Sequence, residues 1–265
     1  MKKLRSFATN HPVLFVLIAL IAWLAVWIVF LVIASALLGM PFFEVLPMTV
    51  SRLATILCML LLLWRMGWLK DAGVTRLGTG MIWLIALGGI GYMIPASLYS
   101  FFGKVTFDPV YLFQQPGAPS IMLSNFVVAI NEEVFFRGLV LLVLMRAWGA
   151  GKWGRIGSVL LTSLIFALPH LMQVFSGALP SRVVPLLLLQ SLVISFWWGA
   201  LVAAGGSIWP AVLVHFIGNS VVALQGLTAA VIEPVSHGYQ RLLLFSLPLG
   251  VLGILLLARG SIRRK

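Results

Sequence analysis

The chain has 265 residues, of which 62% are hydrophobic and only 9% are charged. A soluble domain carries about 25% charged residues, so this composition excludes the soluble classes and indicates an integral membrane protein. The net charge of +12 would suggest a nucleic-acid partner in a soluble chain. In a membrane protein it is explained by basic residues that flank the spans on the cytoplasmic side. We therefore expect the lipid bilayer, and no nucleic acid, among its partners.

Apolar segments long enough to cross a bilayer follow one another along the chain. A transmembrane helix needs about 20 such residues, and the first run, after Met-Lys-Lys-Leu-Arg, is too long for a signal-peptide core. The predicted spans are residues 13–38, 48–68, 81–102, 120–148, 157–176, 184–204, 208–232 and 240–259. The sequence thus predicts an all-α integral membrane protein, a bundle of about eight transmembrane helices that forms a single polytopic domain over residues 1–265.

The distribution of lysine and arginine predicts the orientation of this bundle. With the N-terminus inside, thirteen of the eighteen basic residues lie on the cytoplasmic side, four lie outside (Arg52 among them), and Arg137 lies within a span. Such a bias places both termini in the cytoplasm. Because the chain is short and carries no organelle signal, we expect a multi-pass protein of the bacterial inner (plasma) membrane.

The fourth predicted span contains the charged segment Asn-Glu-Glu-Val-Phe-Phe-Arg-Gly, residues 131–138. A charged side chain at the bilayer centre costs about 2.5–3.5 kcal/mol on insertion scales and usually faces the bundle interior. Glu133 and Arg137 are four residues apart with the acid first, which favours an ion pair on one helix face. Glu132 is rotated from Glu133 by about 100°. We therefore predict that Glu133 is structural and that Glu132 is poised to accept a proton.

Two histidines lie inside apolar segments. His170 follows Pro169, which cannot donate a backbone hydrogen bond, so we expect the helix to be bent or opened there. His215 precedes Asn219 by four residues, and the two share a helix face. One buried histidine is more often a satisfied core residue than a catalytic group. Two of them, in a chain that also buries two glutamates and an arginine, indicate a polar intramembrane site.

Several chemistries fit these residues. A carboxylate base, a histidine and a histidine–asparagine pair can activate water and stabilise an oxyanion, and peptide-bond hydrolysis needs both. The same side chains could instead hold zinc, with Glu132, His170 and His215 as ligands from three helices. The charged span alone also fits a buried ion pair that fixes packing, or ion or proton transport. A transporter, however, is expected to show interrupted helices in paired halves, and none is visible.

Three motifs occur in order on separate predicted helices: EExxxR (Glu132 to Arg137), FxxxH (Phe166 to His170) and HxxxN (His215 to Asn219). Together they resemble the type II CAAX prenyl endopeptidases and bacteriocin-processing enzymes, the CPBP (Abi) family of intramembrane proteases. The resemblance covers residues 120–231, and no motif position departs from the family pattern. The first three spans carry no family signature.

The resemblance implies an eight-helix fold around a polar cavity and an endopeptidase that acts on membrane-associated peptides or proteins. It assigns water activation to Glu132 and His170, oxyanion stabilisation to His215 and Asn219, and organisation of the site to Glu133 and Arg137. The family includes both metal-dependent and glutamate-dependent proteases. We expect no required cofactor, because an asparagine beside His215 suits an oxyanion donor better than a zinc ligand; zinc is the alternative. Relatives that act in immunity or as scaffolds leave a non-catalytic role open.

Overall fold

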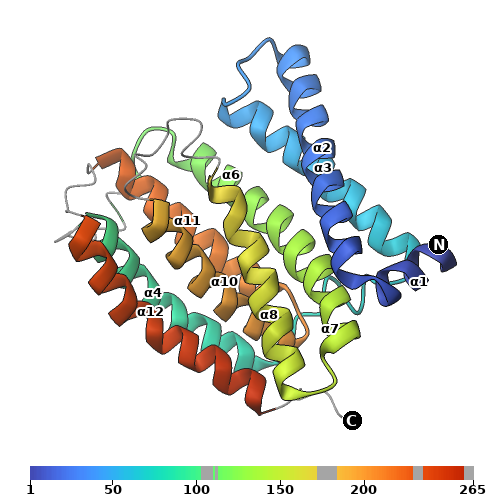
Figure 1. Ribbon diagram of the computed structural model, residues 1–265. Coiled ribbons are helices and arrows are strands. Elements are labelled where there is room, and N and C mark those ends of the chain that lie inside the picture. The colour runs from blue at the N-terminus through green and yellow to red at the C-terminus, as the bar shows by residue number, and fades with distance from the viewer. Residues whose placement is uncertain (103–109, 111–112, 172–183, 229–234, 260–265) are drawn as a thin grey trace.

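The computed structural model describes residues 1–102, 110, 113–171, 184–228 and 235–259, and this part of the chain is helical without any strand (Figure 1). The helices are α1 (Lys2–Asn10), α2 (Pro12–Leu38), α3 (Val45–Arg65), α4 (Gly80–Phe102), α6 (Ala118–Glu133), η1 (Val134–Leu141), α7 (Leu142–Trp148), α8 (Lys152–Ala167), η2 (Leu168–Leu171), α10 (Val184–Gly205), α11 (Trp209–Thr228) and α12 (Val235–Ala258). The predicted all-helical fold class is confirmed for these residues.

Four helical segments within the described residues are long and apolar enough to cross a membrane: Pro12–Leu38, Val45–Arg65, Lys152–Leu171 and Val184–Gly205. Helices also occupy the other four predicted segments, but the count of eight spans is not established and stays a prediction. The fourth segment differs from a uniform apolar span for a physical reason. It carries four charged side chains, three of them between residues 132 and 137, and its backbone changes from α6 to the π-helical η1 at Val134.

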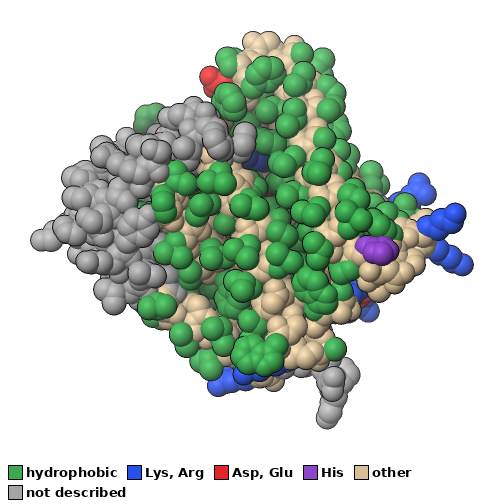
Figure 2. Space-filling model, in the orientation of Figure 1, with side chains coloured by type: hydrophobic (Ala, Val, Ile, Leu, Met, Phe, Trp, Pro, Cys, Tyr) green, Lys and Arg blue, Asp and Glu red, His purple; other side chains and the backbone are tan. Residues whose placement is uncertain are grey.

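The helices form a bundle with a hairpin at one side. The hairpin consists of α2 and α3, which pack on each other and meet the remaining helices through α6, η1 and α7 (Figure 1). Helix α10 packs against α8, α11 and α12, and its residues from Ser195 to Leu201 are all buried. Figure 2 shows hydrophobic side chains spread over the described part of the visible face, as expected for a surface in contact with lipid.

A close approach between α4 and α10 depends on one glycine. A Cβ atom added at Gly89 would lie 2.0 Å from the Trp197 side chain, whereas one added at Gly88 or Gly91 would meet no heavy atom within 4 Å. Small residues commonly allow helices to approach closely in membranes. Gly89 thus leaves room for fully buried Trp197, whose neighbour Trp198 in α10 stacks on His215.

Basic residues from separate helices lie near one end of the bundle. Arg146 of α7 pairs with Asp71, which follows α3, at 2.6 Å. Arg155 of α8 donates a hydrogen bond of 3.3 Å to the backbone oxygen of Leu257 in α12, and the Arg5 guanidinium of α1 lies against Gly67. These contacts bring Arg5, Arg146 and Arg155 to the same end of the bundle, which is formed by α1, α7, α8 and α12. We call it the basic end.

Candidate active site

The two adjacent glutamates lie at the junction of α6 and η1. Short π-helical segments inside α-helices are frequent at functional sites, and every residue of η1 is buried. Across the junction, Arg137 Nη1 donates a hydrogen bond of 2.9 Å to Glu133 Oε1, and both side chains are fully buried. The predicted ion pair thus forms, and it does so inside the bundle rather than toward lipid.

The other side of the Arg137 guanidinium is held by α8 and α10. Its Nη2 donates to Ser195 Oγ at 2.7 Å and to the Ser195 backbone oxygen at 3.3 Å. The guanidinium carbon also lies 4.7 Å from the ring centroid of Phe166 and 5.4 Å from that of Trp198. Arginine is thus fixed between an acid, a hydroxyl and two aromatic rings. Sequence reasoning missed Ser195 and Trp198, because neither belongs to a motif.

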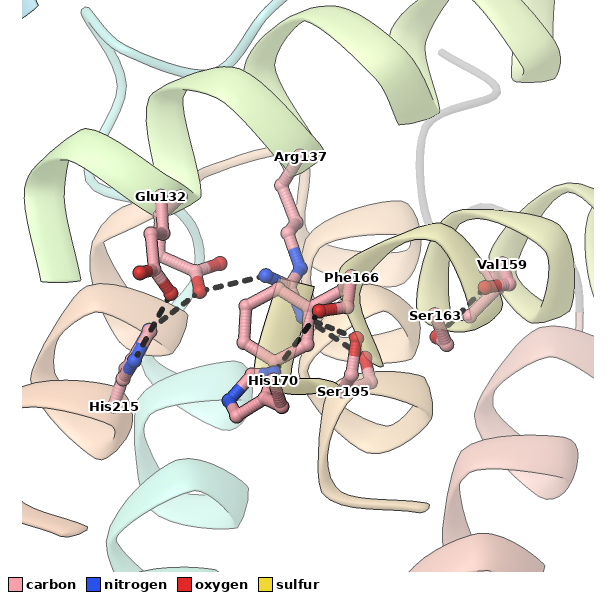
Figure 3. A network of polar contacts seen from close by, with 9 residues as sticks. Glu132, Arg137, Val159, Ser163, Phe166, His170, Ser195 and His215 are labelled. Carbon is pink, nitrogen blue, oxygen red and sulfur yellow. Dashed lines mark hydrogen bonds and ion pairs between the residues drawn. The ribbon is translucent and has the colours of Figure 1, made fainter. Parts of the chain in front are cut away.

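His215 of α11 joins the same group of side chains and links both glutamates (Figure 3). Its Nδ1 lies 2.9 Å from Glu133 Oε1, and its Nε2 lies 3.7 Å from Glu132 Oε2. An ionised carboxylate only accepts hydrogen bonds, so Nδ1 carries the proton toward Glu133, and Nε2 faces Glu132. The imidazole also stacks on Trp198 with ring centroids 4.3 Å apart. Its contact with Glu133 was not predicted.

The two glutamates have different surroundings. The Glu133 side chain is 0% exposed and pairs with Arg137 and His215, whereas the Glu132 side chain is 20% exposed. Within the described residues, Glu132 forms no ion pair with an arginine or lysine. The structure therefore shows the difference in surroundings that the rotation of about 100° between Glu132 and Glu133 predicts.

His170 lies in η2, at the point where α8 gives way to a 3-10 turn at Leu168. This change of helix type agrees with the opening expected from Pro169. The Nδ1 atom of His170 lies 3.2 Å from the Phe166 backbone oxygen. His170 is close enough to Glu132 and His215 for their charges to act on it, and Figure 3 shows it below Phe166, on the side of the site where His215 lies.

Asn219 is half-buried on α11, one turn after His215. No hydrogen bond joins it to another described residue. The structure thus brings Glu132, Glu133, Arg137 and His215 into direct contact. It places His170 and Asn219 nearby on η2 and α11 without such contacts, and the catalytic roles of all six residues stay predictions.

The alternative zinc site was expected from Glu132, His170 and His215. Among the described residues, no three or more His, Cys, Asp or Glu side chains are arranged to hold a metal ion. The contact of His215 Nδ1 with Glu133 leaves Nε2, which faces Glu132, as the ring nitrogen that could bind a ligand. Whether the site uses zinc stays a prediction.

A comparison with known protein families finds a match for the segment that contains the site residues. Residues 114–221 match the family profile described as type II CAAX prenyl endopeptidase Rce1-like. The match overlaps the predicted range 120–231 and contains all three motifs. No curated protein and no solved structure matches the chain. The resemblance drawn from the motifs is confirmed over residues 114–221, which are similar to the Rce1-like type II CAAX prenyl endopeptidases.

Proposed function

We propose that the protein is an intramembrane endopeptidase that hydrolyses peptide bonds of membrane-associated peptides or proteins with a water molecule activated by Glu132. The observation that carries the proposal is the unequal pair of carboxylates. Glu133 is enclosed by Arg137 and His215, whereas adjacent Glu132 is partly exposed and lacks a basic ion-pair partner among the described arginines and lysines. A partly exposed carboxylate that is not paired with an arginine or lysine is suited to take a proton from water.

In the proposed reaction, Glu132 removes a proton from water as the water oxygen attacks the carbonyl carbon of the scissile bond. The carbonyl oxygen becomes an oxyanion, and the proton is later passed to the amine that leaves. His215 is held by Glu133 with its Nε2 toward Glu132. In its doubly protonated form, this ring donates from Nε2 to the oxyanion, and Asn219 supplies a second donor from the next turn of α11.

The charges of the site support this assignment. Arg137 compensates the charge of Glu133, and Arg52 lies within the electrostatic reach of Glu132. A neutral group of paired charges is the least costly way to keep ionised side chains at membrane depth. We assign His170 to holding the attacking water, because it lies within the electrostatic reach of Glu132 and is anchored to the Phe166 backbone.

Hydrolysis can be tested on the full-length protein in nanodiscs with a pool of lipid-anchored peptides, with mass spectrometry to find new peptide termini. The same readout in cells with and without the protein compares the termini of membrane peptides. We expect products with the wild-type protein alone. If no terminus changes in either setting, the protein is a non-catalytic member that acts in immunity or as a scaffold.

Metal removal separates the two mechanisms known for the family. If Glu132 is the base, chelation with EDTA or 1,10-phenanthroline should leave the cleavage rate unchanged, because the proposed proton transfer requires no ion. Elemental analysis of the active protein provides a second readout. Loss of activity on chelation, restored by stoichiometric zinc and accompanied by loss of bound zinc in the His170→Ala and His215→Ala variants, would establish the zinc mechanism instead.

We further infer that the basic end formed by α1, α7, α8 and α12 faces the cytoplasm of a bacterial inner membrane, since loops rich in lysine and arginine stay inside. Reporter fusions after Lys265 should then report the cytoplasm, and fusions in the connection before α6 should report the outer side. An external reporter after Lys265 would show that the inferred orientation is wrong.

A further inference from the structure

Arg52 is a charged residue inside the predicted membrane span 48–68. It lies in the second turn of α3, is half-buried, and has its guanidinium carbon 5.3 Å from the ring centroid of Trp27 on α2. No ion pair joins it to a carboxylate of the described residues. Charged side chains within spans usually pair with one another and mark functional sites. From the charge distribution we expected Arg52 on the outer side of the membrane. The structure instead shows it in contact with Asn131 of α6.

Arg52 is connected to the candidate base. Its backbone oxygen accepts a hydrogen bond of 3.2 Å from Asn131 Nδ2, and Asn131 directly precedes Glu132. The charges of Arg52 and Glu132 also attract each other, although the two side chains do not form an ion pair. Arg52 therefore lies close enough to act in the same site while Glu132 stays available as a base.

Other donors in this part of the molecule also lack acceptors among the described residues. Trp27 Nε1 is buried with no hydrogen-bond partner in the described part of the chain, and the same holds for Asn125 Nδ2 on α6. Asn125 precedes Glu132 by seven residues, so both lie on the same helix face. Indole and guanidinium groups only donate, and a buried donor without an acceptor calls for an explanation. A group that satisfies these donors must be a hydrogen-bond acceptor.

We propose that Arg52 and Trp27 form a binding site for a carboxylate of the peptide substrate, supplied either by its C-terminus or by an aspartate or glutamate side chain. This inference rests on the proposed hydrolysis, because an anion bound next to Glu132 belongs to the molecule that is cleaved. A guanidinium can bind a carboxylate through two parallel hydrogen bonds, and Trp27 adds a third donor. Both residues lie outside the matched segment 114–221, so the family match assigns them no role.

The test uses three membrane-anchored peptides of one otherwise uncharged sequence: one with a free C-terminal carboxylate, one with a C-terminal amide, and one with the amide and a single internal glutamate. Binding and kcat/KM are measured on the full-length protein in nanodiscs of zwitterionic lipid. We expect at least one carboxylate peptide to be preferred over the neutral amide peptide by about 10- to 100-fold, as for a hydrogen bond to a charged group. Which of the two is preferred identifies the source of the carboxylate.

Variants assign this preference to the two residues. Arg52→Gln should bring the ratio of carboxylate to neutral peptide close to one. Trp27→Phe keeps the ring under Arg52 but loses the N–H, so the ratio should fall by about two- to tenfold. Arg52→Lys keeps the charge but loses the two-pronged geometry, so an intermediate ratio is expected. The matched control is Arg65→Gln, an arginine of the same helix that also lies over a tryptophan, Trp64, at 5.5 Å; it should keep the wild-type ratio.

Three results would overturn the site. They are equal binding of all three peptides by the wild-type protein, a slowing of all peptides by the same factor in Arg52→Gln, and Arg52-dependent binding of phosphatidylglycerol without any carboxylate preference. The second would mean that Arg52 acts only through Glu132, and the third that a lipid phosphate occupies the site. If the protein binds carboxylate peptides preferentially but cleaves none, the proposed hydrolysis is wrong and the carboxylate site stands. If it cleaves all three peptides without preference, the carboxylate site is wrong and the proposed hydrolysis stands. If Arg52→Gln does not fold, Arg52→Lys and Trp27→Phe provide the same test.

Discussion

Replacing Glu132 with glutamine is expected to abolish peptide cleavage while the protein stays folded. Glutamine keeps the size of the side chain but cannot accept a proton from water, and general-base catalysis typically contributes about 10²–10⁴-fold to a rate. The fold should survive because the only ionic contact of Glu132 among the described residues is with His215 at 3.7 Å, and its side chain is 20% exposed. The measurements are kcat for a cleaved peptide and thermal unfolding of the same preparation.

A matched control is the same substitution at Glu44, which is exposed and directly precedes α3. Glu44→Gln should change neither the rate nor the unfolding temperature. Cleavage by Glu132→Gln at close to the wild-type rate would remove Glu132 from its role as base. Loss of cleavage together with loss of folding would show that Glu132 is structural, contrary to the assignment made here.

Contacts within one helix were predictable from the sequence, because helical geometry fixes which side chains meet. The Glu133–Arg137 pair follows from a spacing of four residues, and it survives the change to π-helical geometry at Val134. The 3-10 turn that contains His170 follows from Pro169 in the same way. The apolar segments likewise predicted where helices form, but their lengths alone do not establish how many of them cross the membrane.

Contacts between helices were not predictable in this way. His215 meets Glu133 across 82 residues of sequence, and Ser195 meets Arg137 across 58. Such pairs depend on how helices rotate and tilt against one another, which no local pattern encodes. A lone serine in an apolar helix gives no signal at all. Arg52 did give a signal, because it is a charged residue within a predicted span. The count of basic residues on the two sides of the membrane, however, assigned it to the outer surface.

The adjacency of the two glutamates has a structural consequence. Successive residues of a helix point about 100° apart, so a pair of carboxylates can serve two environments at one depth in the membrane. Glu133 points into the closed group formed with Arg137 and His215, and Glu132 points toward the more open side. The closed group thereby holds His215 in the orientation that directs its Nε2 to Glu132. One helix can thus position both a structural carboxylate and the proposed general base.

Replacing Glu133 with glutamine is expected to lower the free energy of unfolding by about 3–5 kcal/mol, because it leaves the Arg137 guanidinium as a buried charge without a counter-ion. The Glu133 and Arg137 side chains are both 0% exposed, so water cannot replace the lost partner. Unfolding in mixed detergent micelles measures the change. Glu132→Gln should be much less destabilising; if it is the more harmful of the two, the structural role belongs to the other glutamate.

Two further variants test whether the loss comes from the stranded charge. Asp71→Asn breaks the Arg146–Asp71 pair, whose side chains are 33% and 49% exposed, and exposed pairs contribute only about 0–1 kcal/mol. The double variant Glu133→Gln/Arg137→Met removes both buried charges, so it should be more stable than Glu133→Gln alone, since an apolar replacement of a whole buried pair is often neutral. Equal losses in the single and double variants would instead mean that the hydrogen bonds to His215 and Ser195, rather than charge balance, hold the helices together here.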